Sequence, residues 1–148
     1  MNNTGLVLAL LLLGVSTPHV FAALTMDQMR NAAKMIRNVC QPKTGVATEL
    51  IDQISEGVFD EENRDLKCYI KCAMQMMQSM GSNGKLRPDA AISQAKKMLP
   101  IEIRDAMIAG IDTCRNVDKE NPGLDPCDLA LVATKCVYNH TKDVFLFP

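Results

Sequence analysis

The most constraining feature of this chain is a set of six cysteines that follows an apolar N-terminal segment. They are Cys40, Cys68, Cys72, Cys114, Cys127 and Cys136. An even number of cysteines in a small exported protein indicates a disulfide framework. A zinc site is the weaker interpretation, because the tightest spacing is C-x3-C and only one histidine, His140, lies beyond residue 22. We therefore expect three disulfides, no metal and no cofactor.

The N-terminal segment has the pattern of a secretion signal. Residues 6–15 form an apolar run that is too short to cross a bilayer of about 30 Å as a helix. Val20, Phe21 and Ala22 then place small residues where a signal peptidase cleaves. The expected signal peptide is 1–22, although no Lys or Arg precedes the apolar run. Residues 23–148 would form one domain outside the cell, with no membrane insertion.

Helical geometry removes some of the fifteen ways in which six cysteines can pair. Cys68 and Cys72 are four residues apart, so on a helix they share a face and are poorly placed to join each other. Cys127 and Cys136 are nine apart, which on a helix puts them on opposite faces and about 13 Å apart. Excluding both pairs leaves ten pairings, among which geometry alone does not choose.

The periodicity of apolar residues predicts an all-α protein of six helices. Thr25 with Gln28 has the spacing of a capping box, and Pro42 and Gly45 are expected to end the first helix. Asp125 and Pro126 suit the start of the last one. The expected ranges are 26–39, 48–57, 61–80, 88–99, 101–117 and a helix that begins at 125.

Composition excludes several classes of function. The 148 residues carry 16 basic and 17 acidic side chains, a net charge of −1, so nothing predicts nucleic-acid binding. A secreted helical hydrolase would need a histidine base beside a carboxylate, and His140 stands alone near the C-terminal tail. We therefore expect a protein that is not an enzyme. A disulfide-bonded structural or signalling module without a cavity remains as an alternative.

The full cysteine pattern, C-x27-C-x3-C-x41-C-x12-C-x8-C, resembles the insect odorant-binding protein family in its pheromone-binding and general odorant-binding branch. The stretches 43–46, KTGV, and 66–72, LKCYIKC, also resemble sequences of that family. The resemblance covers essentially all of 23–148. It implies a six-helix disulfide-bonded fold around an apolar cavity, with bridges Cys40 to Cys72, Cys68 to Cys127 and Cys114 to Cys136.

The resemblance also implies a function and a set of partners. Members of the family carry small hydrophobic odorants or pheromones through the aqueous fluid around sensory neurons, which makes an olfactory receptor a candidate partner. Relatives in other fluids carry or scavenge other apolar compounds, and this alternative stays open. The sequence leaves open whether the protein is a monomer or a weak homodimer.

Candidate ligand contacts follow from the resemblance and from methionine, whose flexible thioether suits pockets for varied apolar shapes. The expected contacts are Ile70, Ala73, Met77, Ile92, Ala95, Leu99, Met107, Ile108, Thr134, Val137, Phe145 and Leu146. Core packing is the alternative role for each of them.

The last residues are unusually apolar for a tail. Phe145, Leu146 and Phe147 would be costly to expose, so we expect this segment to fold back on the domain. Relatives whose C-terminal segment covers the cavity favour a lid that touches ligand. Because Asp143, the terminal carboxylate and His140 lie beside it, we hypothesise that acidification loosens the lid.

Overall fold

The computed structural model describes residues 23–148, and the expected signal peptide lies outside this range. The helices of this part are α1 (Met26–Thr44), α2 (Thr48–Ile54), α3 (Arg64–Met76), α4 (Pro88–Met98), α5 (Ile101–Thr113), α6 (Val117–Glu120) and α7 (Pro126–Thr141). Six of them match the six predicted helices, while α6 is a further turn of four residues. Outside the helices, the described chain has one isolated antiparallel bridge, between Met80 and Leu86.

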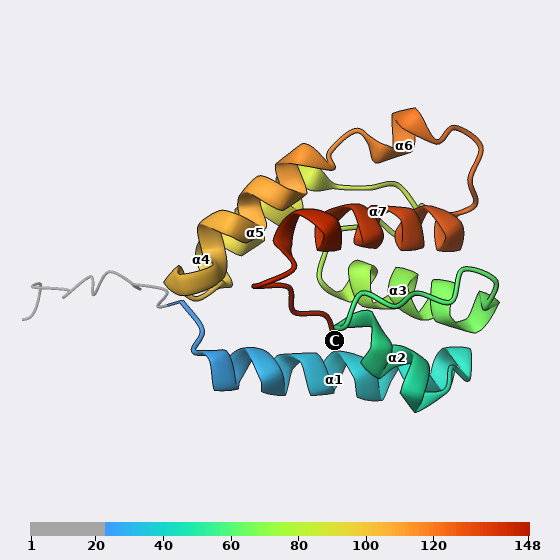
Figure 1. Ribbon diagram of the computed structural model, residues 1–148, viewed down its shortest axis with the longest axis horizontal. Helices are drawn as coiled ribbons and strands as arrows, with labels where there is room; N and C mark the ends of the chain where they lie inside the picture. The colour runs from blue at the N-terminus through green and yellow to red at the C-terminus, as the bar shows by residue number, and fades with distance from the viewer. Residues whose placement is uncertain (1–22) are drawn as a thin grey trace, which may run out of the picture.

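Helix α3 lies at the centre of the fold and packs against α1 on one side and α7 on the other. Figure 1 shows these three helices as stacked layers, with α4 and α5 forming a hairpin at one end. Helix α5 also packs against α7, so the hairpin is joined to the stack. The core between the layers contains the fully buried side chains of Ile54, Leu66, Tyr69, Ile70 and Met80.

Three disulfides join the helices. Cys40 to Cys72 links α1 to α3, Cys68 to Cys127 links α3 to α7, and Cys114 to Cys136 links the end of α5 to α7. These are the three pairs that the resemblance implies. Cys68 and Cys72 bond to different helices, and so do Cys127 and Cys136, as their helical spacing predicts.

Several helix boundaries differ from the sequence prediction. Helix α1 continues through Pro42 to Thr44, and Gly45 ends it in the left-handed conformation with φ 76°. Helix α3 is shorter than predicted, since the Asn63 side chain caps its start and accepts from the Leu66 amide at 2.9 Å. At its other end Gln78 has φ 59°, which turns the chain away from the helix axis.

Helix α5 also ends earlier than predicted. The chain leaves the helix at Cys114, whose sulfur is bonded to Cys136 of α7. Beyond it the amides of Arg115 and Val117 donate to the carbonyls three residues earlier, those of Asp112 and Cys114. This is the pattern of a tighter 3₁₀ turn. The predicted single helix over 101–117 is therefore wrong at its C-terminal end.

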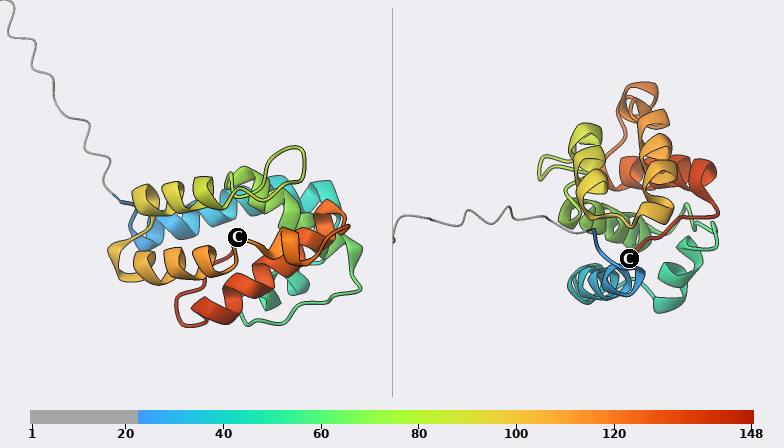
Figure 2. Two further views of the ribbon diagram at one scale, coloured as in Figure 1. Left: turned by 90° about the horizontal axis from the view of Figure 1, so that it is seen from above. Right: turned by 90° about the vertical axis from the view of Figure 1, so that its left-hand side faces the viewer.

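The C-terminal segment, 142–148, turns back from α7 into the molecule. In all views of Figures 1 and 2 the last residue lies among the helices. Phe145 packs edge-on against Tyr138 of α7 with ring centroids 5.2 Å apart, and Phe147 stacks on Phe145 at 6.2 Å. The predicted return of this apolar segment onto the domain is confirmed.

Candidate ligand-binding cavity

A partly enclosed cavity of about 460 Å³ lies between α1, the hairpin α4–α5, α7 and the C-terminal segment. The face of α1 toward it is formed by Met29, Ala32, Ala33 and Ile36, which recur at the spacing of one helical stripe. Leu24 closes the wall beside them, because its amide donates to the Met98 carbonyl of α4 at 2.9 Å.

The opposite walls come from the other helices. Helix α3 contributes Met74, Met76 and, just beyond its end, Met77. The hairpin contributes a stripe on each helix, which includes Ala91, Ala95 and Met98 on α4 and Met107 and Ile111 on α5. Helix α7 adds Ala133, Thr134 and Val137. This lining is almost entirely apolar.

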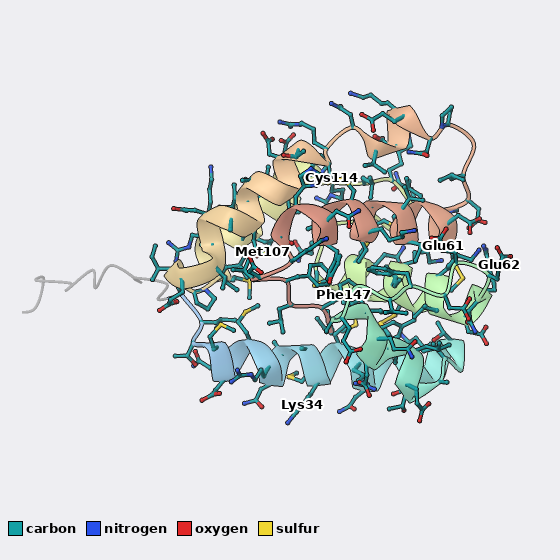
Figure 3. All side chains as sticks on the ribbon, viewed as in Figure 1. Lys34, Glu61, Glu62, Met107, Cys114 and Phe147 are labelled. Carbon is teal, nitrogen blue, oxygen red and sulfur yellow. A yellow bond between two sulfur atoms is a disulfide. The ribbon has the colours of Figure 1, made fainter. Side chains whose placement is uncertain are left out.

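The last four residues, Phe145, Leu146, Phe147 and Pro148, complete the lining. In Figure 3, Phe147 lies between α1 and α7, whereas Lys34 points away from α1 into solvent. The Tyr69 hydroxyl donates to the Pro148 main-chain oxygen at 2.6 Å and so fixes the end of the segment. Burial raises the pKa of Tyr69 to about 12, opposed by Arg37 and assisted by Asp52, so the phenol is a neutral donor at physiological pH.

Eight of the twelve predicted contacts lie on the cavity wall: Met77, Ala95, Leu99, Met107, Thr134, Val137, Phe145 and Leu146. Ile70 and Ala73 are instead fully buried in the core, nearer the start of α3 than the methionines that reach the cavity. Ile92 and Ile108 lie next to the wall residues Ala91 and Met107 in sequence, and the helical turn of about 100° per residue carries them off the lining stripe.

The contribution of α1 to the cavity was not predicted from the sequence. Apolar periodicity predicts a helix over 26–39, but nothing in the pattern separates a side chain that faces a cavity from one that packs in a core. Met98, Ile111 and Phe147 were missed for the same reason. Helical periodicity was the signal that could have placed them on an inner face.

The cavity wall has little charge. Arg115 is the one charged side chain among the described lining residues, and it pairs with Asp112 at 2.8 Å and Asp89 at 2.7 Å. Such a wall offers apolar contact and a few neutral hydrogen-bonding groups. It provides no nucleophile beside a base, so it is suited to binding.

One group of metal-ligating residue types does come together near α7. One ligand atom from each of Cys114, Cys136 and His140 lies within 4.8 Å of the others. Both sulfurs are used in the disulfide, however, and therefore cannot act as thiolate ligands. His140 Nδ1 lies 2.9 Å from the Cys136 carbonyl oxygen.

Comparison with known proteins identifies the family. The model of the PBP/GOBP family matches residues 22–140. The chain therefore belongs to the PBP/GOBP family. Two curated relatives are general odorant-binding protein 72 of Anopheles gambiae, 31% identical over 85% of this chain and 100% of the relative, and general odorant-binding protein 19a of Drosophila melanogaster, 34% identical over 88% of each.

Solved structures of the family have the same fold. Odorant binding protein 4 of Chrysopa pallens has a TM-score of 0.75 and 32% identity over 84% of this chain and 99% of its own. Odorant binding protein 5 of Apis mellifera has a TM-score of 0.76 and 26% identity over 86% of this chain and 100% of its own. The all-helical, six-cysteine fold that the resemblance implies is therefore confirmed. Within 23–148, no helix is both long and apolar enough to cross a membrane.

Proposed function

We propose that the protein is a secreted, soluble carrier that binds small hydrophobic molecules, odorants or pheromones, in this cavity and brings them through extracellular fluid to receptors. The apolar cavity of about 460 Å³ is the observation that carries the proposal. Family membership supports it, because the relatives are named for odorant binding. The eight predicted contacts on the wall are the proposed ligand contacts.

Such a cavity binds through buried area. A ligand that buries about 250 Å² of apolar surface gains about 6 kcal/mol at 25 cal/mol per Å². The entropic cost of association and ordering reduces this figure, and polar contacts add to it. We expect dissociation constants on the order of micromolar, which allow both capture and release.

The C-terminal segment is the proposed lid, with Phe145 and Leu146 in contact with ligand. Its position on the cavity wall supports this role. The contacts that hold it are aromatic packing and the Tyr69 hydrogen bond. His140 and Asp143 are exposed and form no ion pair within the described part of the chain.

The hypothesis that acidification loosens this lid has a test of its own, separate from the test of ligand binding. Affinity is measured near pH 7 and pH 5 for the full chain and for a chain that ends before Asp143. A larger loss of affinity at pH 5 in the full chain than in the shortened chain supports the hypothesis. The same ratio of the affinities at pH 7 and pH 5 in both proteins contradicts it.

The carrier function is tested by the binding of N-phenylnaphthylamine, a dye that fluoresces in apolar surroundings, to residues 23–148 with three disulfides verified by mass. Displacement by a panel of alcohols, esters, aldehydes and aromatics then ranks the ligand classes. Saturable binding in the micromolar range supports a carrier. Absence of binding to both the full-length domain and the chain that ends before Asp143 would exclude the proposal.

A matched pair of variants assigns the binding to the cavity. Ala33 lines the cavity on α1, whereas Ala106 is exposed on α5 and does not. Ala33→Phe fills part of the cavity and should weaken dye binding by about tenfold or more, which corresponds to about 1.4 kcal/mol. Ala106→Phe adds the same ring to the surface and should leave the affinity unchanged.

A further inference from the structure

The hydroxyl of Thr134 is a buried polar group in the cavity wall with a poor partner. Thr134 lies on α7, lines the cavity and is 5% exposed. Its hydroxyl donates to the Met74 sulfur at 3.7 Å. A thioether is a weak acceptor, so this donor gains little from the contact.

Three other helical threonines of the described chain make a stronger bond. Thr44, Thr113 and Thr141 each donate to the main-chain carbonyl four residues earlier, at 3.1, 2.9 and 2.8 Å. This bond is the usual outlet for a threonine hydroxyl inside a helix. The Thr134 hydroxyl is turned toward the sulfur instead, and so remains available to a better acceptor.

The other polar side chains of the cavity wall have oxygen partners or, like the amide of Gln78, are exposed to solvent. Ser79 donates to the Met74 carbonyl at 3.0 Å, and Gln94 donates to the Gln78 side-chain oxygen at 3.1 Å. Arg115 is held by two aspartates. Thr134 differs from these residues, because its hydroxyl donates to a sulfur atom and is buried from water.

We propose that the Thr134 hydroxyl donates to an oxygen of the ligand, and that the ligand class is a neutral apolar molecule with a carbonyl, ester or alcohol oxygen. This inference rests on the proposed carrier function. The oxygen lies at the wall where α7 meets Met74 of α3, and the hydrocarbon part extends along the apolar stripes of α1 and α4. The ligand oxygen replaces the Met74 sulfur as acceptor.

The charge of the wall restricts the class further. An amine would need an anionic partner, and a carboxylate would need a free cation. The described wall has no acidic side chain, the main-chain oxygen of its last residue, Pro148, already accepts from Tyr69, and its one cationic side chain, Arg115, is paired. Burial of a charged ligand group without a partner is strongly unfavourable, so the ligand is neutral.

The test compares decanal with decane, which share a chain length and differ in the carbonyl. Each displaces N-phenylnaphthylamine from the wild-type domain and from Thr134→Val, which keeps the branched shape and removes the hydroxyl. We expect the wild type to favour decanal by about three- to tenfold, the range of a net hydrogen bond. Thr134→Val should lose this preference and bind decane as before.

Two controls assign the effect to the hydroxyl. Thr134→Ser retains the donor and should retain most of the preference for decanal. Gln94→Leu removes a polar group elsewhere on the wall and should leave the preference intact. Loss of the preference in Gln94→Leu with its retention in Thr134→Val would place the polar contact at the glutamines and overturn the inference.

A measurement on the wild type needs no variant. The infrared carbonyl stretch of bound decanal should fall to lower frequency than in an alkane solvent, because hydrogen bonding weakens the C=O bond. An alkane-like frequency in the bound state overturns the inference while the carrier function stands. Failure of the wild type to bind the dye would instead overturn the carrier function itself.

Discussion

At the scale of single residues, Gly57 shows how closely the loop after α2 approaches α7. Gly57 has φ 78°, and a Cβ atom at this position would lie 2.2 Å from the ring of Tyr138. That ring is held in place, since its hydroxyl donates to the Glu56 carbonyl at 3.0 Å and it packs against the rings of Phe59 and Phe145. The position therefore requires both a left-handed backbone and the absence of a side chain.

Gly57→Ala should destabilise the domain more than Gly45→Ala does. Gly45 has φ 76°, but a methyl group there would have no atom within 4 Å, so its substitution carries only the backbone strain. We expect a loss of about 1 kcal/mol for Gly45→Ala and about 3 kcal/mol for Gly57→Ala, because the overlap adds to the strain. Urea unfolding of the oxidised proteins measures both. Equal losses would show that the Tyr138 ring moves aside at no cost.

At the scale of helices, the start of α7 is fixed to the start of α3 by charge. Asp125 caps α7 by accepting from the Cys127 amide at 2.8 Å, and its other oxygen accepts from Arg64 at 2.6 Å. Lys67 pairs with Asp128 at 2.7 Å beside it. The Arg64 guanidinium, with help from Asp128 and the two amides, holds the pKa of the Asp125 carboxyl well below its usual range.

Asp125→Asn should reduce the dependence of stability on pH in the acid range. Because the folded carboxyl binds a proton less readily than the unfolded one, its contribution is complete above the unfolded pKa of about 3.9 and is lost as the pH falls below it. Asparagine still caps the helix but does not titrate. The wild type should be more stable at pH 6, and the difference should shrink toward pH 3. Urea unfolding of both proteins at several pH values between 6 and 3 measures this difference in the free energy of unfolding. A difference that does not change with pH would contradict this account.

The helices also show what the sequence could and could not predict. The six helices and their capping residues Thr25 and Asp125 follow from local patterns, since both the period of 3.6 and the caps are properties of neighbouring residues. The ends of α3 and α5 depend on contacts between distant segments, such as the Cys114 disulfide, which local patterns do not contain.

The same limit applies to the cavity. Ala91 and Ile92 are adjacent apolar residues of α4, and only the first lines the cavity. The choice between them depends on the rotation of α4 against α5 and α7, which the amphipathic pattern fixes only to within a broad apolar stripe. Thr134 was expected as a ligand contact from the resemblance to the family; it lies on the wall, and its contact with ligand stays a prediction.

At the scale of the whole molecule, part of the cavity wall is the chain's own end. The C-terminal segment enters between α1 and α7 (Figure 2). Its last four residues line the cavity. Tyr138 on α7 and Tyr69 on α3 both contact it, and the Tyr138 ring is in turn packed against Phe59. A proposed lid of this kind can open only if these contacts break together.

Tyr69→Phe should weaken the attachment of this segment without altering any side chain that lines the cavity. Tyr69 is not a lining residue, and its hydroxyl bonds to the Pro148 main-chain oxygen in a buried site. Removal of the hydroxyl leaves that buried oxygen without this donor, so we expect a loss of about 1 to 3 kcal/mol in the free energy of unfolding. Amides of 144–147 should exchange hydrogen faster, and bound N-phenylnaphthylamine should dissociate faster in stopped-flow displacement.

Tyr138→Phe is the control, because it removes an exposed hydroxyl bond to Glu56 and keeps the ring that packs on Phe145. If both variants change exchange and dissociation equally, the aromatic packing holds the segment and the Tyr69 bond does not.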